Sequence, residues 1–447
     1  MYRAFMHHLF STGLFSVTHR SPALGGAALA VLSLLTGCGD SVSEGGPVTA
    51  FEGGRVVAGD GNAAIEDAVL LVQDGEFIAV GPRADVEIPG SAERVDLTGQ
   101  TVIPALVNTH MHTPLDGREG LISFLEHNAY WGVGAVASLG LDSSAVSFEV
   151  RDQTIPGAAR LRTAGRGITA PEPGRSEVPY WVTSEEEARA AVQELAARPV
   201  DLVKIWVDSR GGEYDKLSPS IYVALIDEAH NHGLRVAAHI FELEDAKNLL
   251  RAGVDAFAHS VRDQEVDEEL ISLFQGMPLT VLIPNLPNPG VERDVAWVGA
   301  TVPEDELAEI EAGATEDAER QRAFEIQANN LAALSEAGVQ IGFGTDGGNP
   351  WTAHNELEDM VSAGMDPADV IVAATRNSAA FLGINDMGTI EAGKSADFVV
   401  LEADPLEDIT NSRRISAVYL RGDEVDREAI AARLSAPDAA AGAASAP

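Results

Sequence analysis

Residues 101–112 read Thr-Val-Ile-Pro-Ala-Leu-Val-Asn-Thr-His-Met-His, an apolar run that ends in two histidines one residue apart. An apolar run of this length between turns predicts a buried strand. Because residues i and i+2 of a strand share a face, His110 and His112 can point at the same ion. The stretch therefore predicts a strand whose carboxyl end carries two convergent imidazoles.

Seven more apolar segments of strand length follow, and amphipathic segments of helical length separate them. This alternation is typical of a parallel α/β sheet, and eight strands favour a closed TIM-type (β/α)8 barrel spanning residues 105–385. Active-site residues are then expected at the carboxyl ends of the strands. The predicted strands are 101–109, 133–138, 159–164, 201–207, 234–240, 254–259, 279–284 and 340–345.

Both ends of the folded region carry short β-branched runs split by glycine turns, which are typical of antiparallel strands. One set lies within residues 51–104 and the other within 386–432. We expect the two sets to pair into one small β-sandwich beside the barrel. Residues 38–50 have the composition of a linker, and residues 433–447 that of a disordered tail.

The N-terminus has the features of an export signal. Residues 22–37 are apolar but too short for a settled transmembrane helix, and only basic charges, Arg3 and Arg20, precede them. The following Leu35-Thr36-Gly37-Cys38 resembles a bacterial lipobox, in which the cysteine is lipidated. Residues 1–37 are therefore predicted to be a lipoprotein signal peptide, and Cys38 the anchor of an exported protein in the periplasm or on the cell surface. An ordinary signal followed by an unlipidated cysteine is the alternative.

Charge and composition exclude several classes of protein. The chain of 447 residues has 30 Lys plus Arg against 69 Asp plus Glu, a formal net charge of −39. Binding to nucleic acid needs a basic face, so this partner is excluded. With 45% hydrophobic residues the chain can bury a large core, which excludes wholesale disorder.

Further polar residues recur at the carboxyl ends of the predicted strands. The fifth strand ends at His239, the sixth at His259 and the eighth at Asp346, while Lys204 lies within the fourth. Together with the first two histidines they would converge on one rim. Imidazole and carboxylate ligands without thiolate suit zinc, manganese, iron or nickel.

Lys204 is the most informative of these residues. A lysine within Leu-Val-Lys-Ile-Trp-Val, residues 202–207, would be buried at a high desolvation cost unless it had a partner. Reaction with carbon dioxide would convert its amine to an anionic carbamate that can bridge two cations. The alternatives are an ion pair with an acid, or a side chain that extends to the rim.

These residues resemble the motifs of the amidohydrolase superfamily, and within it the imidazolonepropionase-like and Xaa-Pro dipeptidase (prolidase) group. The resemblance extends over nearly all of the chain from Gly54 to Leu420. Two departures, Ala105 in place of a usual glycine and Asn108 in place of a common aspartate, lie beside the ligands. The matching motifs are residues 102–112, V-K-I at 203–205, G-T-D at 344–346, A-A-T-R-N at 373–377 and M-G-T-I-E-A-G-K-S-A-D at 387–397.

The resemblance implies a binuclear centre of two divalent ions, with zinc favoured. It implies that His110, His112 and Asp346 hold the more buried ion, that His239 and His259 hold the other, and that carboxylated Lys204 bridges both. The ions would share a hydroxide that attacks the substrate carbonyl. Asp346 would accept its proton and pass it to the leaving amine.

The substrate is less well specified. A dipeptide or an N-acyl amino acid is expected, and no other partner except the membrane is implied, although a homo-oligomer is compatible with the sequence. Arg262 and Arg210 are rim cations that could bind a substrate carboxylate, and Asn285 and His354 could shape the pocket.

Three other functions stay open. A mononuclear deaminase would use His239 and Glu242, which form an H-x-x-E motif, but would not need Lys204. A lactone or phosphotriester hydrolase would use the same binuclear centre. A surface lipoprotein that binds ligands without turnover would be expected to lack part of the ligand set, whereas all six residues are present.

Overall fold

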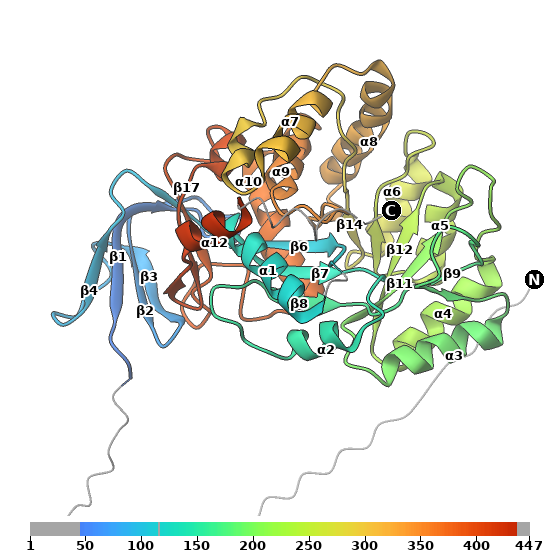
Figure 1. The fold of residues 1–447 in the computed structure, drawn as a ribbon, viewed down its shortest axis with the longest axis horizontal. Helices are drawn as coiled ribbons and strands as arrows, with labels where there is room; N and C mark the ends of the chain where they lie inside the picture. The colour runs from blue at the N-terminus through green and yellow to red at the C-terminus, as the bar shows by residue number, and fades with distance from the viewer. Residues whose placement is uncertain (1–44, 115–116, 436–447) are drawn as a thin grey trace, which may run out of the picture. The chain divides into compact units, whose positions relative to one another are not determined.

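The protein was analysed as a computed structural model, in which residues 45–114 and 117–435 are described (Figure 1). The predicted signal peptide, Cys38 and most of the predicted tail lie outside these residues. No helix in the described ranges is long and apolar enough to cross a membrane.

Eight parallel strands, in sequence order and separated by helices, form the central part of the protein. They pair as two sheets, of three and seven strands, because two short strands, β9 (Ile168–Thr169) and β10 (Tyr180–Trp181), extend the second sheet beside β11. The eight strands are β6 (Leu106–Met111), β7 (Val133–Ser138), β8 (Arg160–Thr163), β11 (Leu202–Val207), β12 (Arg235–Ile240), β13 (Ala256–Ala258), β14 (Val281–Ile283) and β15 (Gln340–Ile341).

Backbone hydrogen bonds connect the two sheets at both of their junctions. Thr109 N donates to Phe343 O over 2.9 Å, where β6 lies beside the segment after β15, and Asp201 N donates to Thr163 O over 2.9 Å, between β8 and β11. The central part therefore has a TIM-type α/β fold. Within the described residues its strand pairing is not the single continuous ladder that the sequence predicts.

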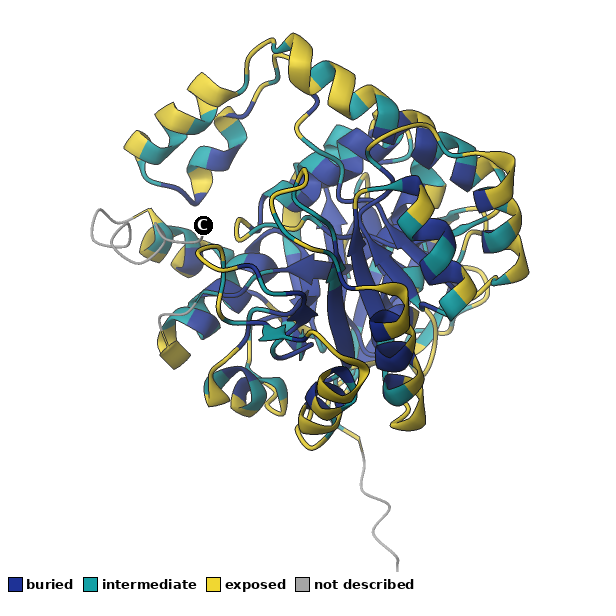
Figure 2. Ribbon diagram, turned by 90° about the vertical axis from the view of Figure 1, so that its right-hand side faces the viewer, coloured by how far each residue is buried: buried dark blue, intermediate teal, exposed yellow. Residues whose placement is uncertain are grey.

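Helices cover the strands, and the strands are almost entirely buried (Figure 2). Parallel strands packed on both faces are apolar throughout, which is why these segments read as continuous apolar runs. The helices are α1 (Gly117–Tyr130), α2 (Ala145–Arg151), α3 (Glu185–Ala196), α4 (Pro219–Asn231), α5 (Leu243–Ala252), α6 (Glu268–Gly276), α7 (Glu304–Gly313), α8 (Ala318–Glu336), α9 (Thr352–Ser362), α10 (Pro367–Val372), the π-helical η2 (Ala373–Asn377), α11 (Ser378–Leu382) and α12 (Arg427–Leu434).

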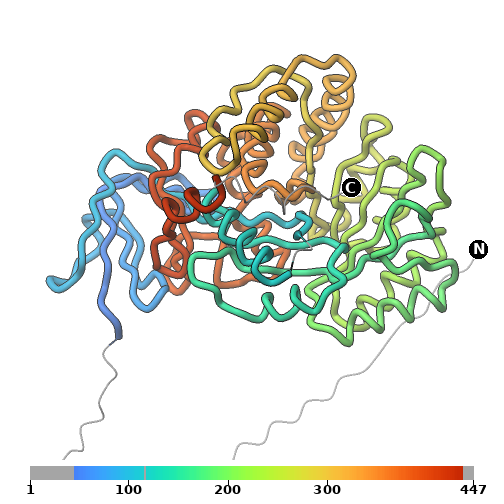
Figure 3. The backbone as a smooth tube through the Cα atoms, viewed as in Figure 1, coloured from blue at the N-terminus to red at the C-terminus, as the bar shows by residue number. Residues whose placement is uncertain are grey.

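The strands from the two chain ends form one eight-stranded sheet, hereafter the end sheet. Figure 3 shows the segments from the two ends side by side. The ends meet where β5 pairs with β16 in antiparallel register, Phe398 opposite Pro104. Hydrogen bonding thus connects the strands of both chain ends into a single sheet, in which the ring centroid of Phe77 on β3 lies 5.7 Å from that of Phe398 on β16. Its strands are β1 (Thr49–Val56), β2 (Ile65–Gln73), β3 (Glu76–Pro82), β4 (Glu93–Asp96), β5 (Thr101–Pro104), β16 (Phe398–Leu401), β17 (Ile415–Leu420) and β18 (Asp423–Glu424).

The predicted strand 101–109 is divided between these two parts. It is interrupted at Ala105, so that β5 joins the sheet of the chain ends and β6 begins the central part. Both halves are buried, and the apolar pattern alone carries no sign of the break.

The long connection after β14 is partly helical. It contains the 3-10 helix η1 (Ala296–Ala300) and α7 before α8 begins. Trp297 fixes it to the rest of the protein, since its ring centroid lies 5.1 Å from that of Trp131 and the Arg413 guanidinium lies 5.0 Å from the ring. Arg413 belongs to a second 3-10 helix, η3 (Ile409–Arg413).

Candidate metal centre

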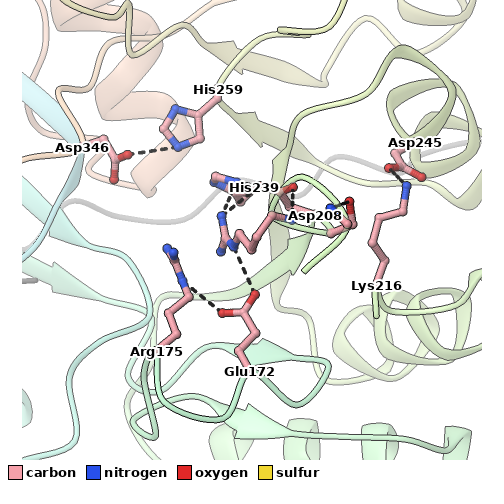
Figure 4. Close-up of polar contacts among 11 residues, drawn as sticks. Glu172, Arg175, Asp208, Lys216, His239, Asp245, His259 and Asp346 are labelled. Carbon is pink, nitrogen blue, oxygen red and sulfur yellow. Dashed lines mark hydrogen bonds and ion pairs between the residues drawn. The ribbon is translucent and has the colours of Figure 1, made fainter. Parts of the chain in front are cut away.

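Three histidines and one aspartate converge at the carboxyl ends of the central strands. His110 Nε2 and His112 Nε2 lie 2.9 Å and 3.1 Å from Asp346 Oδ1. His259 Nε2 lies 3.1 Å from Asp346 Oδ2, and Figure 4 shows this pair. Ligand atoms of His110, His259 and Asp346 all lie within 4.8 Å of one another. This spacing could hold one metal ion.

Four residues at the ends of the central strands have unusual backbone conformations. Arg210, His259, Asn285 and Asp346 all have positive φ, of 53°, 105°, 45° and 52°. Non-glycine residues rarely adopt this region, and such strain clusters at functional sites. Each of these four residues lies directly after a central strand or within a few residues of its end. The strain therefore coincides with the rim that carries the candidate ligands.

The hydrogen bonding of His110 favours a cation beside it. Burial lowers the pKa of His110 to about 4, so the ring is neutral near pH 7. Its Nδ1 lies 2.9 Å from Asn285 Oδ1, an acceptor, and therefore carries the proton. Nε2 then presents a lone pair to the Asp346 carboxylate. Two acceptors at 2.9 Å repel each other unless a cation lies between them, so the donor set fits a metal ion.

Lys204 is completely buried, with an exposed fraction of 0%. Burial lowers the pKa of its amine to about 7, although the Asp346 carboxylate opposes this shift. Among the described residues no group forms a hydrogen bond with Nζ, so neither alternative expected from the sequence, an ion pair or extension to the rim, is found. The Lys204 charge contributes to lowering the pKa of both His110 and His239. Lys204 lies two residues before Trp206, which is opposite His239 in the pairing of β11 with β12.

His239 contacts two polar side chains, and the sequence did not predict this cluster. Its Nε2 lies 2.9 Å from Asp208 Oδ2 and 3.0 Å from Arg210 Nη1, and Arg210 also pairs with Glu172 over 3.1 Å. Figure 4 shows this network beside the His259–Asp346 pair. The ring centroids of His239 and His259 are 4.7 Å apart. Asp208 lies directly after β11, and its position after a strand end was the one available signal.

Two residues expected to bind substrate lie at the site. Burial lowers the pKa of the Arg262 guanidinium, and the negative charge of Asp346 offsets part of this effect. The Nε atom of Arg262 is buried and has no hydrogen-bond partner among the described residues. Arg210 is engaged with His239, Asp208 and Glu172. Arg262 thus keeps a buried donor without a partner in the described part of the chain.

The prediction that His354 contacts substrate is wrong. Its ring is 3% exposed, Nδ1 lies 3.0 Å from Ser412 Oγ, and Nε2 lies 3.1 Å from Trp131 O. Trp131 precedes β7, so these contacts lie near the start of that strand and not at its carboxyl end. Both ring nitrogens are used to join α9 to neighbouring elements.

Comparison with known proteins agrees with the fold and the site. Residues 101–425 match the amidohydrolase family. The chain is 28% identical to an imidazolonepropionase of Agrobacterium fabrum, over 76% of this chain and 85% of the relative. It superposes on the crystal structure of a putative prolidase from Bifidobacterium longum with a TM-score of 0.72 and 27% identity, over 87% of this chain and 99% of that one. A Xaa-Pro dipeptidase with bound methionine has the same fold, with a TM-score of 0.67 and 22% identity over 84% and 99% of the two chains.

The chain therefore belongs to the amidohydrolase family, in the group that resembles imidazolonepropionases and prolidases. It is a hydrolase that acts on carbon–nitrogen bonds.

Proposed function

We propose that the protein is a binuclear metal-dependent amidohydrolase that cleaves an amide bond in a dipeptide or an N-acyl amino acid. The observation that carries this proposal is Lys204, a buried amine without a hydrogen-bond partner among the described residues. It lies on β11, which pairs with the strand that carries His239. Its pKa of about 7 leaves a substantial uncharged fraction at neutral pH, the form that reacts with carbon dioxide. A carbamate there would carry the negative charge that two cations require.

As the resemblance implies, the ligands would divide into two groups, although His259 Nε2 also lies 3.1 Å from Asp346 Oδ2. His110, His112 and Asp346 would hold one ion, and His239 and His259 the other, with carboxylated Lys204 between them. Divalent zinc suits this set of nitrogen and oxygen ligands. When bound, the two ions polarise the substrate carbonyl and lower the pKa of water.

The chain's own residues supply the proton transfer and the substrate's orientation. The Asp346 carboxylate, 35% exposed at the rim, is placed to take a proton from the attacking water and to return it to the leaving amine. The guanidinium of Arg262, a partly buried residue, would bind the substrate's free carboxylate. This carboxylate would distinguish a dipeptide or N-acyl amino acid from a neutral amide.

Metal analysis of the purified protein tests the proposal. We expect close to two divalent ions per chain, and loss of both the second ion and turnover in Lys204→Met. Lys394→Met, at a lysine in a turn of the end sheet, is the matched control and should keep both. A ¹³C carbamate signal after incubation with labelled bicarbonate should be present in the control and absent from Lys204→Met. One ion per chain with full turnover in the wild-type protein contradicts the proposal.

A mononuclear deaminase is the second candidate, because the chain is 25% identical to a 5-methylthioadenosine/S-adenosylhomocysteine deaminase of Symbiobacterium thermophilum over 79% of its length. That function would require Glu242 beside the metal. Glu242 instead pairs with Lys216, its Oε2 lying 3.0 Å from Lys216 Nζ. This contact favours the amide hydrolase. Turnover of lactones or phosphotriesters, but not amides, would indicate a different substrate for the same centre.

We also propose that the protein is exported and anchored through Cys38, on the strength of the lipobox-like sequence. Mass spectrometry of the mature N-terminus, with Cys38→Ser as the comparison, tests this location separately from the activity.

A further inference from the structure

We propose that Asn285 and Glu356 are positioning residues that hold His110 in the orientation and tautomer of an Nε2 metal ligand. The inference rests on the proposed metal centre but goes beyond it, since neither residue is expected to touch the ions or the substrate. It also gives Asn285 a different role from the substrate contact suggested by the sequence.

Asn285 contacts His110 directly. It lies two residues after β14 and is 5% exposed, and its Oδ1 is 2.9 Å from His110 Nδ1. An amide oxygen only accepts hydrogen bonds, so Nδ1 of the ring must be the donor. The lone pair of the neutral ring is then on Nε2, the atom that faces Asp346 at 2.9 Å.

The backbone at Asn285 needs support to stay in this position. Its φ of 45° lies in the left-handed region, which disfavours a non-glycine residue and persists only where the surroundings enforce it. Glu356, on α9, provides this support. Its two carboxylate oxygens lie 3.2 Å and 3.0 Å from the amide nitrogen of Leu286, the residue that follows Asn285.

Burying the carboxyl group of Glu356 in this position costs free energy. It is 4% exposed, and a carboxyl group is costly to bury where one backbone amide is its main partner. A chain of contacts thus leads from α9 through the turn after β14 to the ring of His110. Partners of this kind fix the tautomer of a ligating histidine, and their loss lowers metal affinity about 10–100-fold.

The two variants Asn285→Asp and Asn285→Leu separate this role from simple packing. A carboxylate can accept from His110 Nδ1 as the amide oxygen does, whereas leucine cannot. Competition with a chelator should therefore give a metal affinity near that of the wild type for Asn285→Asp and one about 10–100-fold weaker for Asn285→Leu. Glu356→Gln, which keeps an acceptor for Leu286 N, should likewise bind metal more tightly than Glu356→Leu.

A second readout does not depend on the metal. In the metal-free protein, ¹⁵N NMR of the histidine rings should show the proton of His110 on Nδ1 in the wild type and in Asn285→Asp, but not in Asn285→Leu. Asn128→Leu is the control for loss of a buried asparagine, because the side chain of Asn128 donates to Phe124 O within α1. It should lower the melting temperature without changing the affinity or the tautomer.

Two results would overturn the inference. If Asn285→Asp loses as much affinity as Asn285→Leu, the amide nitrogen and not the oxygen faces the ring. If both variants bind metal like the wild type, Asn285 does not position His110. A wild-type protein that binds no metal, with the proton of His110 on Nδ1, would instead overturn the proposed function and leave the tautomer assignment intact.

Discussion

Gly140 lies against the side chain of Lys204, so closely that a Cβ atom at residue 140 would come within 2.9 Å of Lys204 Cγ. The same atom would lie 2.5 Å from Cη2 of Trp206, and the φ of Gly140 is 94°. Only glycine fits both the conformation and the space. The position of the buried lysine therefore depends on a residue in the loop after β7.

Gly140→Ala should displace Lys204 and so remove the second metal ion and most of the turnover. Gly157→Ala is a matched control, since Gly157 also has a positive φ, of 70°, but an added Cβ would meet nothing within 4 Å. Both variants incur the left-handed strain of roughly 1–2 kcal/mol. Metal content and melting temperature should separate them, and equal metal content in the two would show that the contact with Lys204 is unimportant.

Glu242→Gln should leave amide hydrolysis nearly unchanged. Glu242 contacts Lys216, and its side chain is 41% exposed, so the exchange removes a surface ion pair that contributes about 1 kcal/mol or less. The measurement is kcat/KM for dipeptides, with ammonia release from purines and related heterocycles assayed in parallel. Loss of an ammonia-releasing activity in this variant, together with its persistence in Lys204→Met, would favour the deaminase.

His354→Gln should reduce stability without reducing kcat/KM per folded molecule. Burial lowers the pKa of His354 to about 3, against about 6.5 for an unfolded histidine. The unfolded state therefore binds more protons below pH 6.5, so this residue's contribution to stability is lost as the pH falls from 6.5 toward 3. The His354→Gln variant lacks this pH-dependent contribution to the free energy of unfolding.

Urea unfolding at pH 8 and pH 5 checks the sign. The destabilisation caused by His354→Gln should be about 1–3 kcal/mol at pH 8, from the lost hydrogen bonds, and smaller at pH 5. A destabilisation that grows at the lower pH would show that the imidazole is charged in the folded protein.

Trp297→Ala should loosen the connection that contains η1 and α7. The ring packs against Trp131 and beneath Arg413, and its Nε1 donates to Asp294 O over 3.0 Å. Hydrogen exchange of residues 296–313 should become faster. Trp181→Ala removes a tryptophan from β10, which has no part in this connection, and should leave that exchange unchanged. Unchanged exchange in Trp297→Ala would mean that other contacts hold the segment.

The central strands could be predicted because each one carries its own local signal. A parallel strand buried on both faces needs an apolar run, and the polar residue at its end interrupts that run, as at His239 and His259. The prediction of the amidohydrolase family, made from the same strand ends, is confirmed. The structure brings His110, His112, His259 and Asp346 together, whereas the resemblance groups His259 with His239.

The contacts of the supporting residues could not be predicted in the same way, although the sequence suggests Asn285 and His354 as candidates for the pocket. Asp208 and Asn285 make their contacts across loops, and Asn285 does so from a backbone of positive φ that no short pattern in the sequence encodes. Glu356 and His354 both lie on α9, yet one supports the rim and the other joins the helix to Trp131. Which side of the helix meets which neighbour depends on packing between distant segments.

The pairing of β5 with β16 has a consequence for how the chain folds. Residues 101–104 meet residues 398–401 only after nearly the whole intervening chain has been made, so the end sheet can be completed only late. Until then β5 presents an unpaired edge, which is prone to associate with other chains. A chain truncated before β16 would keep that edge permanently. We therefore expect C-terminal deletions to cause aggregation even though every candidate ligand is retained.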